Sequence, residues 1–507
     1  MAAEPIVLDG RSLTLEEVSR SAAGPVACRL APEAVEAMEA SRAVVERSAA
    51  EGAAVYGVNT GFGDLANVRI EADRLALLQE RLLFSHAAGV GEPLDDEAVR
   101  AMLLLRANAL ARGNSGIRPA VVSRLLELLE RDLLPVVPSR GSVGASGDLA
   151  PLAHLALPVI GRGRLRRAGR EAPAAEVLAA EGLEPLTLGP KEGLALINGT
   201  QAITALLSLA ALETRRLVRL ADLAGALSTD AFRGTDAAFD PRLHELRPYP
   251  GQRRSAANLL RLMRGSQIRE SHRHGDVRVQ DPYCLRCMPQ VHGASRDLLD
   301  DVERRLAVEL NAVTDNPLVF PEGGEVLSGG NFHGQPVALA ADVLALAVAE
   351  LAAISERRIE KLTNAAFSGL PPFLVEDAGL NSGFMIAQVT AAALVSENKT
   401  LCHPASVDSI PTSADKEDHV SMGMWAALKL RQVVANARRV LAVELLAAAQ
   451  GIDLLRPLRS SDPLEALHAD VRGRVEPWSA DREMAPDVEA ATAFLDGGID
   501  RHLEGLA

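Results

Sequence analysis

The stretch TALLSLAALETRRLVRLADLAGAL, residues 204–227, decides the fold class of this chain. Leucine, alanine and valine recur in it at the spacing of one face of a helix. Similar long helical patterns cover residues 296–313, 336–362 and 425–449. Long apolar helices bury their faces against one another, so the sequence predicts a mainly α-helical protein built on a large multi-helix bundle.

The composition of the 507 residues agrees with this prediction. Hydrophobic residues make up 48% of the chain but aromatic residues only 3%, so Ala, Leu and Val carry the apolar content. That balance favours closely packed helices over an aromatic-rich β sandwich. The net charge of −14 argues against nucleic acid or an anionic membrane as a partner.

No segment predicts secretion or membrane insertion. The N-terminus lacks a basic region followed by an apolar run. Asp342 and Glu350 interrupt the most apolar stretch, residues 337–354, which we therefore expect to be a buried helix. The four cysteines indicate a reducing compartment, so we expect a cytoplasmic protein. Cys284 and Cys287 have the spacing of half a zinc site, but no second pair completes it, and we expect no metal.

We expect the chain to divide into consecutive segments. Residues 1–200 are predicted to form a smaller N-terminal lobe with minor short β strands. Residues 201–455 are predicted to form the central long-helix bundle, and residues 456–507 a C-terminal segment of short helices packed on it. Within the lobe, residues 5–13 are predicted to form two short strands and Thr14 to cap the helix that follows.

A second stretch, GSVGASGDLAPLAHLA at residues 141–156, carries the candidate chemistry. If the backbone bends tightly here, the amide nitrogen of Gly147 can attack the carbonyl carbon of Ala145 and close a five-membered ring. Loss of water, including the Ser146 hydroxyl, then leaves an exocyclic methylidene, which is a strong electrophile. Gly147 suits this role because it has no Cβ and tolerates strained backbone angles. The structural alternative is a flexible loop before the helix that starts near Leu149.

The whole of this stretch resembles the signature of the aromatic amino acid ammonia-lyases. Further motifs of that family follow in family order over nearly the whole chain. They are YGVNTGFG with Tyr56, INGTQ with Asn198, QDPYCLRC with Gln280, Tyr283 and Arg286, GGNFHGQP with Phe332, and DKEDHVSM with Glu417. Each motif alone is more often structural, but their combination favours the family. The resemblance implies the cofactor 4-methylideneimidazol-5-one (MIO), formed autocatalytically from Ala145-Ser146-Gly147, without a metal or a nucleotide.

The resemblance also implies the catalytic roles. Removing ammonia from an α-amino acid breaks a C–N bond and a weakly acidic β C–H bond, so both a base and an electrophile are required. Tyr56 is the favoured base, acting as a tyrosinate with a depressed pKa. Tyr283 is expected near the MIO, where it assists ring formation or proton transfer. Asp148 is expected to help ring formation, with Gln280 as a further supporting residue.

Substrate binding is implied in the same way. Arg286 is expected to bind the substrate carboxylate with its planar fork. Asn198 offers amide donors and acceptors to the MIO carbonyl or to the substrate. Phe332 is expected to support the ring by packing. The family further implies a homotetramer in which three chains build each active site.

The choice of amino acid depends on two positions. Ser85-His86 stands where phenylalanine enzymes typically have Phe-Leu and bacterial tyrosine enzymes His-Leu, and it looks like the histidine branch of the family. Glu417 stands where the phenylalanine and tyrosine enzymes usually carry a neutral amide. A carboxylate can accept an imidazole N–H, and His86 can supply the second imidazole contact. Lys416 replaces a glutamine that is frequent in the histidine branch, which leaves the local polarity open.

The sequence therefore predicts elimination of ammonia from L-histidine to give trans-urocanate. The nearest alternative is a tyrosine or phenylalanine ammonia-lyase or an aminomutase with the same MIO chemistry. A catalytically inactive helical scaffold is a third interpretation, which the intact tripeptide disfavours. For Glu417 itself, the structural alternative is that it caps a helix near Asp418 or pairs with Lys416.

Overall fold

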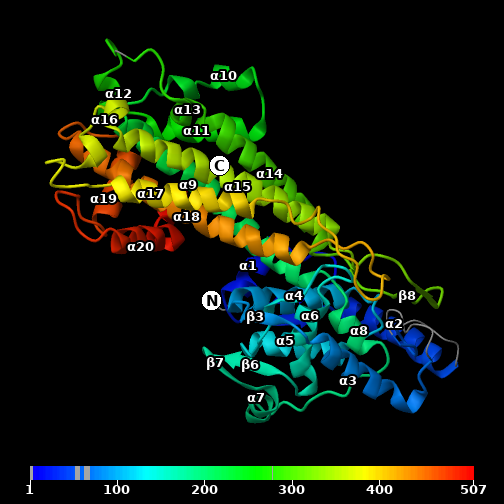
Figure 1. Cartoon of the computed structure of the whole chain (residues 1–507). Helices are drawn as coiled ribbons and strands as arrows, with labels where there is room; N and C mark the ends of the chain where they lie inside the picture. The colour runs from blue at the N-terminus through cyan, green and yellow to red at the C-terminus, as the bar shows by residue number, and fades with distance from the viewer. Residues whose placement is uncertain (1–3, 52–56, 62–68, 277) are drawn as a thin grey trace. The chain divides into compact units, whose positions relative to one another are not determined.

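A computed structural model describes residues 4–51, 57–61, 69–276 and 278–507 of the chain. Helices dominate these residues and the strands are short (Figure 1), so the predicted mainly α-helical fold is confirmed. Contacts group the chain into two compact units. The first unit comprises residues 1–212, 303–342 and 404–428, and the second comprises residues 213–302, 343–403 and 429–507.

Four of the five unit boundaries fall within the long helices, and the fifth, between residues 403 and 404, falls outside them, so each unit is discontinuous in sequence. This grouping differs from the consecutive segments 1–200, 201–455 and 456–507, which stay a prediction. The long helices are α9 Gln201–Ala231, α14 Met288–Glu309, α15 Gln335–Thr363 and α18 Gly423–Leu454. They lie where long helices were predicted.

Among the described helices, α15 alone is long and apolar enough to cross a membrane. However, 67% of its most apolar window is buried inside the protein. Leu344, Val348 and Leu351 are fully enclosed. This is the burial expected of a core helix, so its length and composition are weak support for a membrane span.

The first unit is built around α4, Asp96–Ala111, which is buried on nearly all sides. Helices that are apolar all round occupy the interior of a large protein. Helices α1 and α5 pack against α4, and α3, α6 and α8 pack against one another. The remaining helices are α1 Leu15–Ala23, α2 Pro32–Glu51, η2 Ala72–Arg74, α3 Leu75–His86, α5 Pro119–Glu130, α6 Leu149–Ala156, η3 Leu157–Ile160, α7 Ala174–Ala180 and α8 Glu192–Ile197.

The strands of this unit pair in small sheets. Strand β1 pairs with β2 in parallel, β3 with β5 antiparallel, β4 with β6 and β6 with β7 antiparallel, and β8 with β9 antiparallel. The strands are β1 Ile6–Leu8, β2 Cys28–Leu30, β3 Val90–Pro93, β4 Leu134–Pro135, β5 Pro138–Arg140, β6 Arg164–Arg167, β7 Arg170–Pro173, β8 Leu318–Phe320 and β9 Glu325–Leu327.

The predicted pair of strands within residues 5–13 is wrong, because β1 pairs with β2 instead. The Asp9 carboxylate accepts hydrogen bonds from the backbone N–H of Arg11 at 2.7 Å and of Ser12 at 2.9 Å. These bonds turn the chain into a helix rather than back along β1. The prediction for Thr14 is confirmed: its hydroxyl caps α1 and forms a capping box with Glu17.

The second unit is a helical bundle with shorter helices around it. Helices α11, α17, α19 and α20 carry most of the helical residues outside the long helices. The elements are η4 Ala237–Phe239, α10 Pro241–Glu245, α11 Pro250–Met263, α12 Gln267–Ser271, α13 Tyr283–Arg286, α16 Ala365–Ser368, η5 Pro372–Leu374, α17 Met385–Leu401, α19 Asp462–Arg472, α20 Ala485–Ala493, η6 Phe494–Gly498 and α21 Asp500–Leu503.

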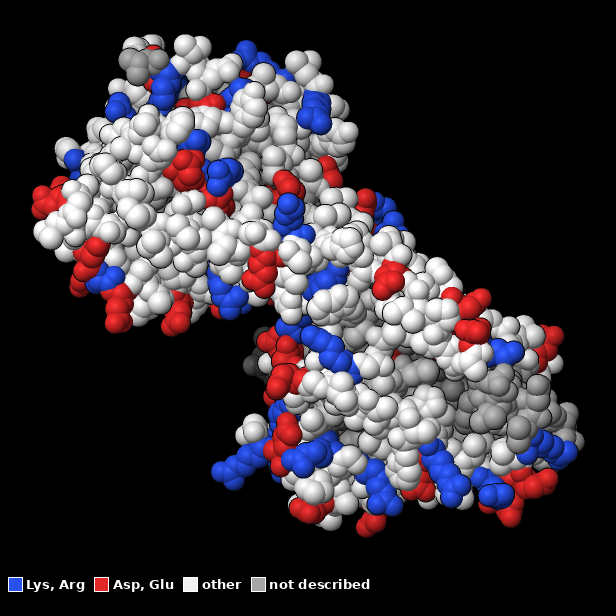
Figure 2. All heavy atoms as spheres, viewed as in Figure 1, with Lys and Arg blue, Asp and Glu red and all other residues white. Residues whose placement is uncertain are grey.

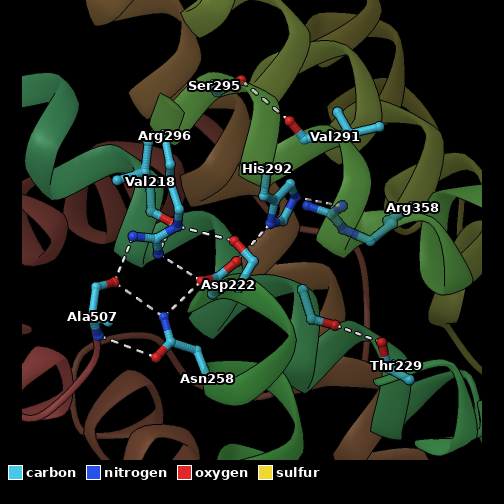
Figure 3. A network of polar contacts seen from close by, with 12 residues as sticks. Val218, Asp222, Thr229, Asn258, Val291, His292, Ser295, Arg296, Arg358 and Ala507 are labelled. Carbon is cyan, nitrogen blue, oxygen red and sulfur yellow. Dashed lines mark hydrogen bonds and ion pairs between the residues drawn. The ribbon is translucent and has the colours of Figure 1, made fainter. Parts of the chain in front are cut away.

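A buried polar network joins helices of the second unit (Figure 3). The Asp222 carboxylate accepts hydrogen bonds from His292 Nδ1 at 2.8 Å, from Arg296 at 2.6 Å and from Asn258 at 2.8 Å. His292 Nε2 accepts a hydrogen bond from Arg358 at 3.4 Å, so the ring is neutral with its proton on Nδ1. Burial raises the pKa of Asp222, but Arg296 and His292 more than offset it, and the pKa lies below its ordinary value. The network thus keeps a buried charge fully bonded.

Charged side chains of both signs are interspersed over the face seen in Figure 2. Basic residues there lie beside acidic ones and form no continuous basic band. Ion pairs with partly or largely exposed side chains also combine the two signs, such as Arg131 with Glu127 and Arg242 with Asp240. Exposed pairs of this kind contribute little to stability.

Candidate active site

The tripeptide Ala145-Ser146-Gly147 lies in the first unit, in the loop between β5 and α6. Gly144 and Gly147 have left-handed backbone, with φ of 69° and 71°. Gly147 runs beside Gly199 and forms a parallel bridge with it. A Cβ at Gly147 would stand 2.1 Å from the carbonyl oxygen of Gly199, so only glycine fits there. The loop therefore bends at the residue whose nitrogen would close the ring.

Asn198 lies beside this loop because α8 ends there. Its Nδ2 donates a hydrogen bond to the carbonyl oxygen of Ser146 at 2.8 Å. The buried guanidinium of Arg106 donates to the Asn198 carbonyl at 3.0 Å and fixes its backbone. The Asn198 Oδ1 atom is buried and has no hydrogen-bond partner among the described residues. An open acceptor thus remains next to the tripeptide.

Asp148 directly follows the tripeptide and is fully buried. Its backbone N–H donates to the Gly199 carbonyl at 2.7 Å. Its carboxylate accepts from the Ser142 hydroxyl at 2.9 Å and from the Ile203 N–H, in the first turn of α9, at 2.8 Å. Burial nevertheless raises the pKa of Asp148 from 3.8 to about 7. A carboxyl that titrates near neutral pH can give or take a proton at this loop.

Glu417 reaches the tripeptide from a distant part of the sequence. Its Oε1 accepts a hydrogen bond from the Ser146 hydroxyl at 2.8 Å, and its Oε2 accepts one from the Thr412 hydroxyl at 2.8 Å. Thr412 and Glu417 also exchange backbone hydrogen bonds of 3.0 and 3.3 Å, which close a tight antiparallel turn. Helix α18 begins only at Gly423, so Glu417 faces the reactive loop rather than the start of that helix.

His86 ends α3 and lies near Glu417. Its Nδ1 donates to the Leu82 carbonyl at 2.9 Å, because a carbonyl oxygen only accepts, and Nε2 is left with a lone pair. Burial lowers the pKa of His86, against the opposing effects of the Leu82 hydrogen bond and the Glu417 carboxylate. The ring is therefore neutral and presents an acceptor.

Side chains from these segments line a cavity of about 530 Å³. Phe332 also lines it, as do His333 and His419, whose rings stack in parallel with centroids 5.8 Å apart. His333 Nε2 donates to the His419 carbonyl at 3.1 Å, which holds the pair together. Of the residues predicted for the site, the cavity includes His86, Ala145, Ser146, Asn198, Phe332 and Glu417.

Gln280, Tyr283 and Arg286 belong to the second unit and are not among the described residues that line this cavity. Tyr283 is 71% exposed, and the Arg286 guanidinium lies over its ring at 4.4 Å from the centroid. Arg286 Nε donates to the Asp281 carbonyl at 3.1 Å. Tyr56 lies outside the described residues.

The structure adds residues that the sequence reasoning missed. Ser142 and Thr412 hold the carboxylates of Asp148 and Glu417, and Arg106 holds Asn198. Arg106 carried a signal, because a lone arginine within the apolar run of α4 must find a buried partner. Thr412 carried none, because nothing in its surroundings indicates that its hydroxyl faces Glu417.

No group of three or more His, Cys, Asp or Glu side chains with metal-binding geometry occurs in the described part of the chain. Cys284 and Cys287 are free thiols, and Cys284 is buried. Burial raises the pKa of the Cys284 thiol to about 11, so it stays protonated at neutral pH.

Comparison with known proteins identifies the family. The family model described as aromatic amino acid lyase matches residues 13–473. A histidine ammonia-lyase of Anaeromyxobacter sp. (strain K) is 57% identical over 98% of this chain and 100% of its own length. A histidine ammonia-lyase of Stigmatella aurantiaca is 53% identical over 97% of this chain and 96% of its own.

Solved structures of similar proteins support the same family assignment. Histidine ammonia-lyase from Trypanosoma cruzi superposes with a TM-score of 0.92 at 46% identity, covering 99% of this chain and 96% of that one. Tyrosine aminomutase from Streptomyces globisporus superposes with a TM-score of 0.94 at 39% identity, covering 99% of both chains. The chain is a carbon–nitrogen lyase by fold and sequence, and it belongs to the aromatic amino acid lyase family.

Proposed function

We propose that the chain eliminates ammonia from L-histidine to give trans-urocanate, as a cytoplasmic enzyme. The observation that carries this proposal is the carboxylate of Glu417, held 2.8 Å from the Ser146 hydroxyl in a cavity that His86 also lines. Two groups that suit an imidazole ring therefore border the reactive tripeptide. An apolar aromatic ring would offer no hydrogen bond to Oε1 of this carboxylate, whose other oxygen is bonded to Thr412.

The electrophile proposed for this reaction is MIO, formed by the chain itself from Ala145, Ser146 and Gly147. The surroundings fit such a ring: Gly147 has the left-handed backbone, and Asn198 already binds the Ser146 carbonyl. The ring supplies an electron-poor methylidene that takes up the substrate and makes its amine a better leaving group. Asp148, with its pKa near 7, suits the proton transfers of ring formation.

Substrate binding is proposed to use the residues of the family motifs. The imidazole N–H donates to Glu417 and the ring makes its second contact with His86. The planar fork of Arg286 binds the α-carboxylate. Tyr56 removes the β proton as a tyrosinate, and Tyr283 assists proton transfer. Gln280 supports Tyr283 and Arg286. Phe332 packs against the MIO ring.

A homotetramer with active sites shared between subunits accounts for the exposed position of Tyr283. Tyr283 is 71% exposed, and Arg286 stacks on it. A tyrosine and an arginine held together at the surface can complete the site of a neighbouring copy. We therefore propose that subunits exchange these residues, and neither nucleic acid nor membrane takes part.

The test compares amino acids on the same preparation. Purified protein is incubated separately with L-histidine, L-tyrosine and L-phenylalanine, and each conjugated acid is followed by its ultraviolet absorbance. β-Amino acid products are followed by chromatography, because a tyrosine aminomutase is among the structural relatives. We expect rapid release of urocanate and little product from the other two. Preferential turnover of tyrosine or phenylalanine would contradict the assignment of histidine.

A Glu417→Gln variant tests the residue on which the choice depends. Loss of a charge-assisted hydrogen bond costs about 1.5–3 kcal/mol, so kcat/KM for histidine should fall about ten- to hundredfold. The thermal midpoint should stay near that of the parent, because the amide NH2 can donate to the Thr412 hydroxyl and the backbone bonds between Thr412 and residue 417 are unchanged. A lowered midpoint with parental histidine kinetics would make Glu417 a structural residue.

A further inference from the structure

We propose that Glu417 has an earlier task than substrate recognition: it holds the hydroxyl of Ser146 while the ring is being formed. The inference rests on the proposed function, because it assumes that Ala145-Ser146-Gly147 closes to MIO. It adds that one carboxylate oxygen has two partners in succession. The first partner is the Ser146 hydroxyl before maturation, and the second is the substrate ring afterwards.

The hydrogen bonds of Ser146 support this order. The Ser146 hydroxyl donates to Glu417 Oε1 at 2.8 Å, although 271 positions separate the two residues in the sequence. Such a long-range contact fixes the side chain of a residue that is only partly buried. Asn198 separately fixes the Ser146 backbone through its carbonyl oxygen. Both the hydroxyl and the backbone of the reacting serine are therefore held before any bond changes.

Glu417 is itself held firmly enough to orient another group. Thr412 donates its hydroxyl to Oε2 at 2.8 Å, so each carboxylate oxygen has one hydrogen bond. The turn between them contains Ser413, Ala414 and Asp415, all left-handed with φ of 55°, 53° and 64°. Non-glycine residues rarely adopt this backbone, and the paired hydrogen bonds of Thr412 and Glu417 keep the turn closed.

Ring closure and dehydration release two waters in total. In the first stage, the Gly147 nitrogen bonds to the Ala145 carbon, and the Ala145 oxygen leaves as water with the protons of the Gly147 and Ser146 amides. A carbon–nitrogen double bond then joins Ala145 to Ser146. In the second stage, the Cα–H and Cβ–Oγ bonds of Ser146 break. The electron pair of the C–H bond forms the methylidene, and the proton and the hydroxyl leave as the second water.

Glu417 acts on the second stage by positioning the leaving hydroxyl. A free serine side chain samples three staggered rotamers and also bonds to nearby backbone groups. The bond to Glu417 selects the rotamer in which the hydroxyl lies at the cavity of about 530 Å³, where the water can depart. Once the oxygen has left, Oε1 has lost that partner and can accept the imidazole N–H.

The experiment measures maturation directly, without relying on activity. Parent, E417Q, E417L and H86L proteins are purified at intervals after a short pulse of expression. Mass spectrometry then follows the peptide containing residues 145–147 for loss of one or two waters. E417Q keeps an acceptor oxygen and should mature as the parent does. E417L has none, and its rate should fall about tenfold or more, since such a bond is worth about 1.5–3 kcal/mol.

H86L is the matched control, because His86 lines the same cavity but its side chain is hydrogen-bonded to Leu82 and Ser85 rather than to Ser146. It should lose two waters at the parental rate while losing affinity for histidine. Full dehydration of E417L at the parental rate would overturn the proposal. If E417L fails to fold, T412V and T412S decide: slow maturation in T412V that T412S restores supports the proposal, and a parental rate in T412V contradicts it.

The same samples separate this inference from the proposed function. A parent that matures but leaves histidine unchanged would refute the choice of substrate and leave the role of Glu417 in maturation standing. An E417L protein that matures normally but loses histidine turnover would refute the maturation role alone. E417Q should separate the role of Glu417 in ring formation from its role in substrate binding. We expect it to have a complete ring but a lowered kcat/KM for histidine.

Discussion

Replacing Gly147 with alanine should damage the first unit far more than the same change at Gly169. Both glycines belong to this unit and have left-handed backbone, with φ of 71° and 75°. At Gly169 an added Cβ meets nothing within 4 Å in the described part of the chain. That variant therefore carries only the cost of the left-handed backbone, about 1–2 kcal/mol.

Gly147→Ala adds a collision to that backbone cost. The new Cβ would lie 2.1 Å from the Gly199 oxygen and 2.4 Å from its carbon, both backbone atoms. Relieving such overpacking costs about 1–3 kcal/mol. It also displaces the oxygen that accepts the Asp148 N–H at 2.7 Å, which adds about 0.5–1.5 kcal/mol. The total is about 2.5–6.5 kcal/mol.

The assay compares the thermal midpoints of the two variants by circular dichroism and the mass of the peptide around residue 147. Gly169→Ala should show a small shift and a fully dehydrated peptide. Gly147→Ala should show a clearly larger shift and an unmodified peptide, because the added methyl also hinders the attacking nitrogen. Equal midpoints, or a completed ring in Gly147→Ala, would refute this reasoning.

Three further changes test other parts of the site. Ser146→Ala should keep the helical circular dichroism signal but show no loss of water in its peptide and lose most activity. Arg286→Lys should lower kcat/KM for histidine about ten- to hundredfold, because one ammonium cannot reproduce the planar fork; unchanged kinetics would remove Arg286 from the site. Burial raises the pKa of Asp148 from 3.8 to about 7, so its contribution to stability is complete below pH 3.8 and is lost as the pH rises to about 7. Urea unfolding midpoints across this range should therefore decline less in Asp148→Asn than in the parent, and parallel declines would contradict the assigned pKa.

The long helices were predictable because their periodicity is local. The segments 204–227, 296–313, 336–362 and 425–449 all lie within observed helices or overlap them closely. The pairing of β1 was not predictable in the same way, because its partner β2 lies beyond a helix. A turn residue such as Asp9 signals a turn, but it does not say whether a strand or a helix follows.

The candidate site likewise contains some residues that the local sequence predicts and others that only long-range contacts bring in. The loop at residues 141–148 was visible because its residue types match its chemistry. Its neighbours depend on contacts across the fold: Thr412 and Arg106 act through Glu417 and Asn198, and no local pattern connects them. The sequence also groups Tyr283 and Arg286 with the loop by motif order, whereas the single chain keeps them in its second unit. Motif order reports a shared role and leaves open which copy of the chain supplies each residue.

The central claim is that the chain makes its own electrophile from Ala145-Ser146-Gly147, and the mass of that peptide tests it most directly. Protein that turns over histidine is digested, and the peptide containing Ser146 is weighed beside the same peptide from Ser146→Ala. We predict that the peptide from the active parent weighs two waters less than its sequence mass. The peptide from Ser146→Ala should have its full sequence mass. An unmodified peptide in fully active parent protein would contradict the account.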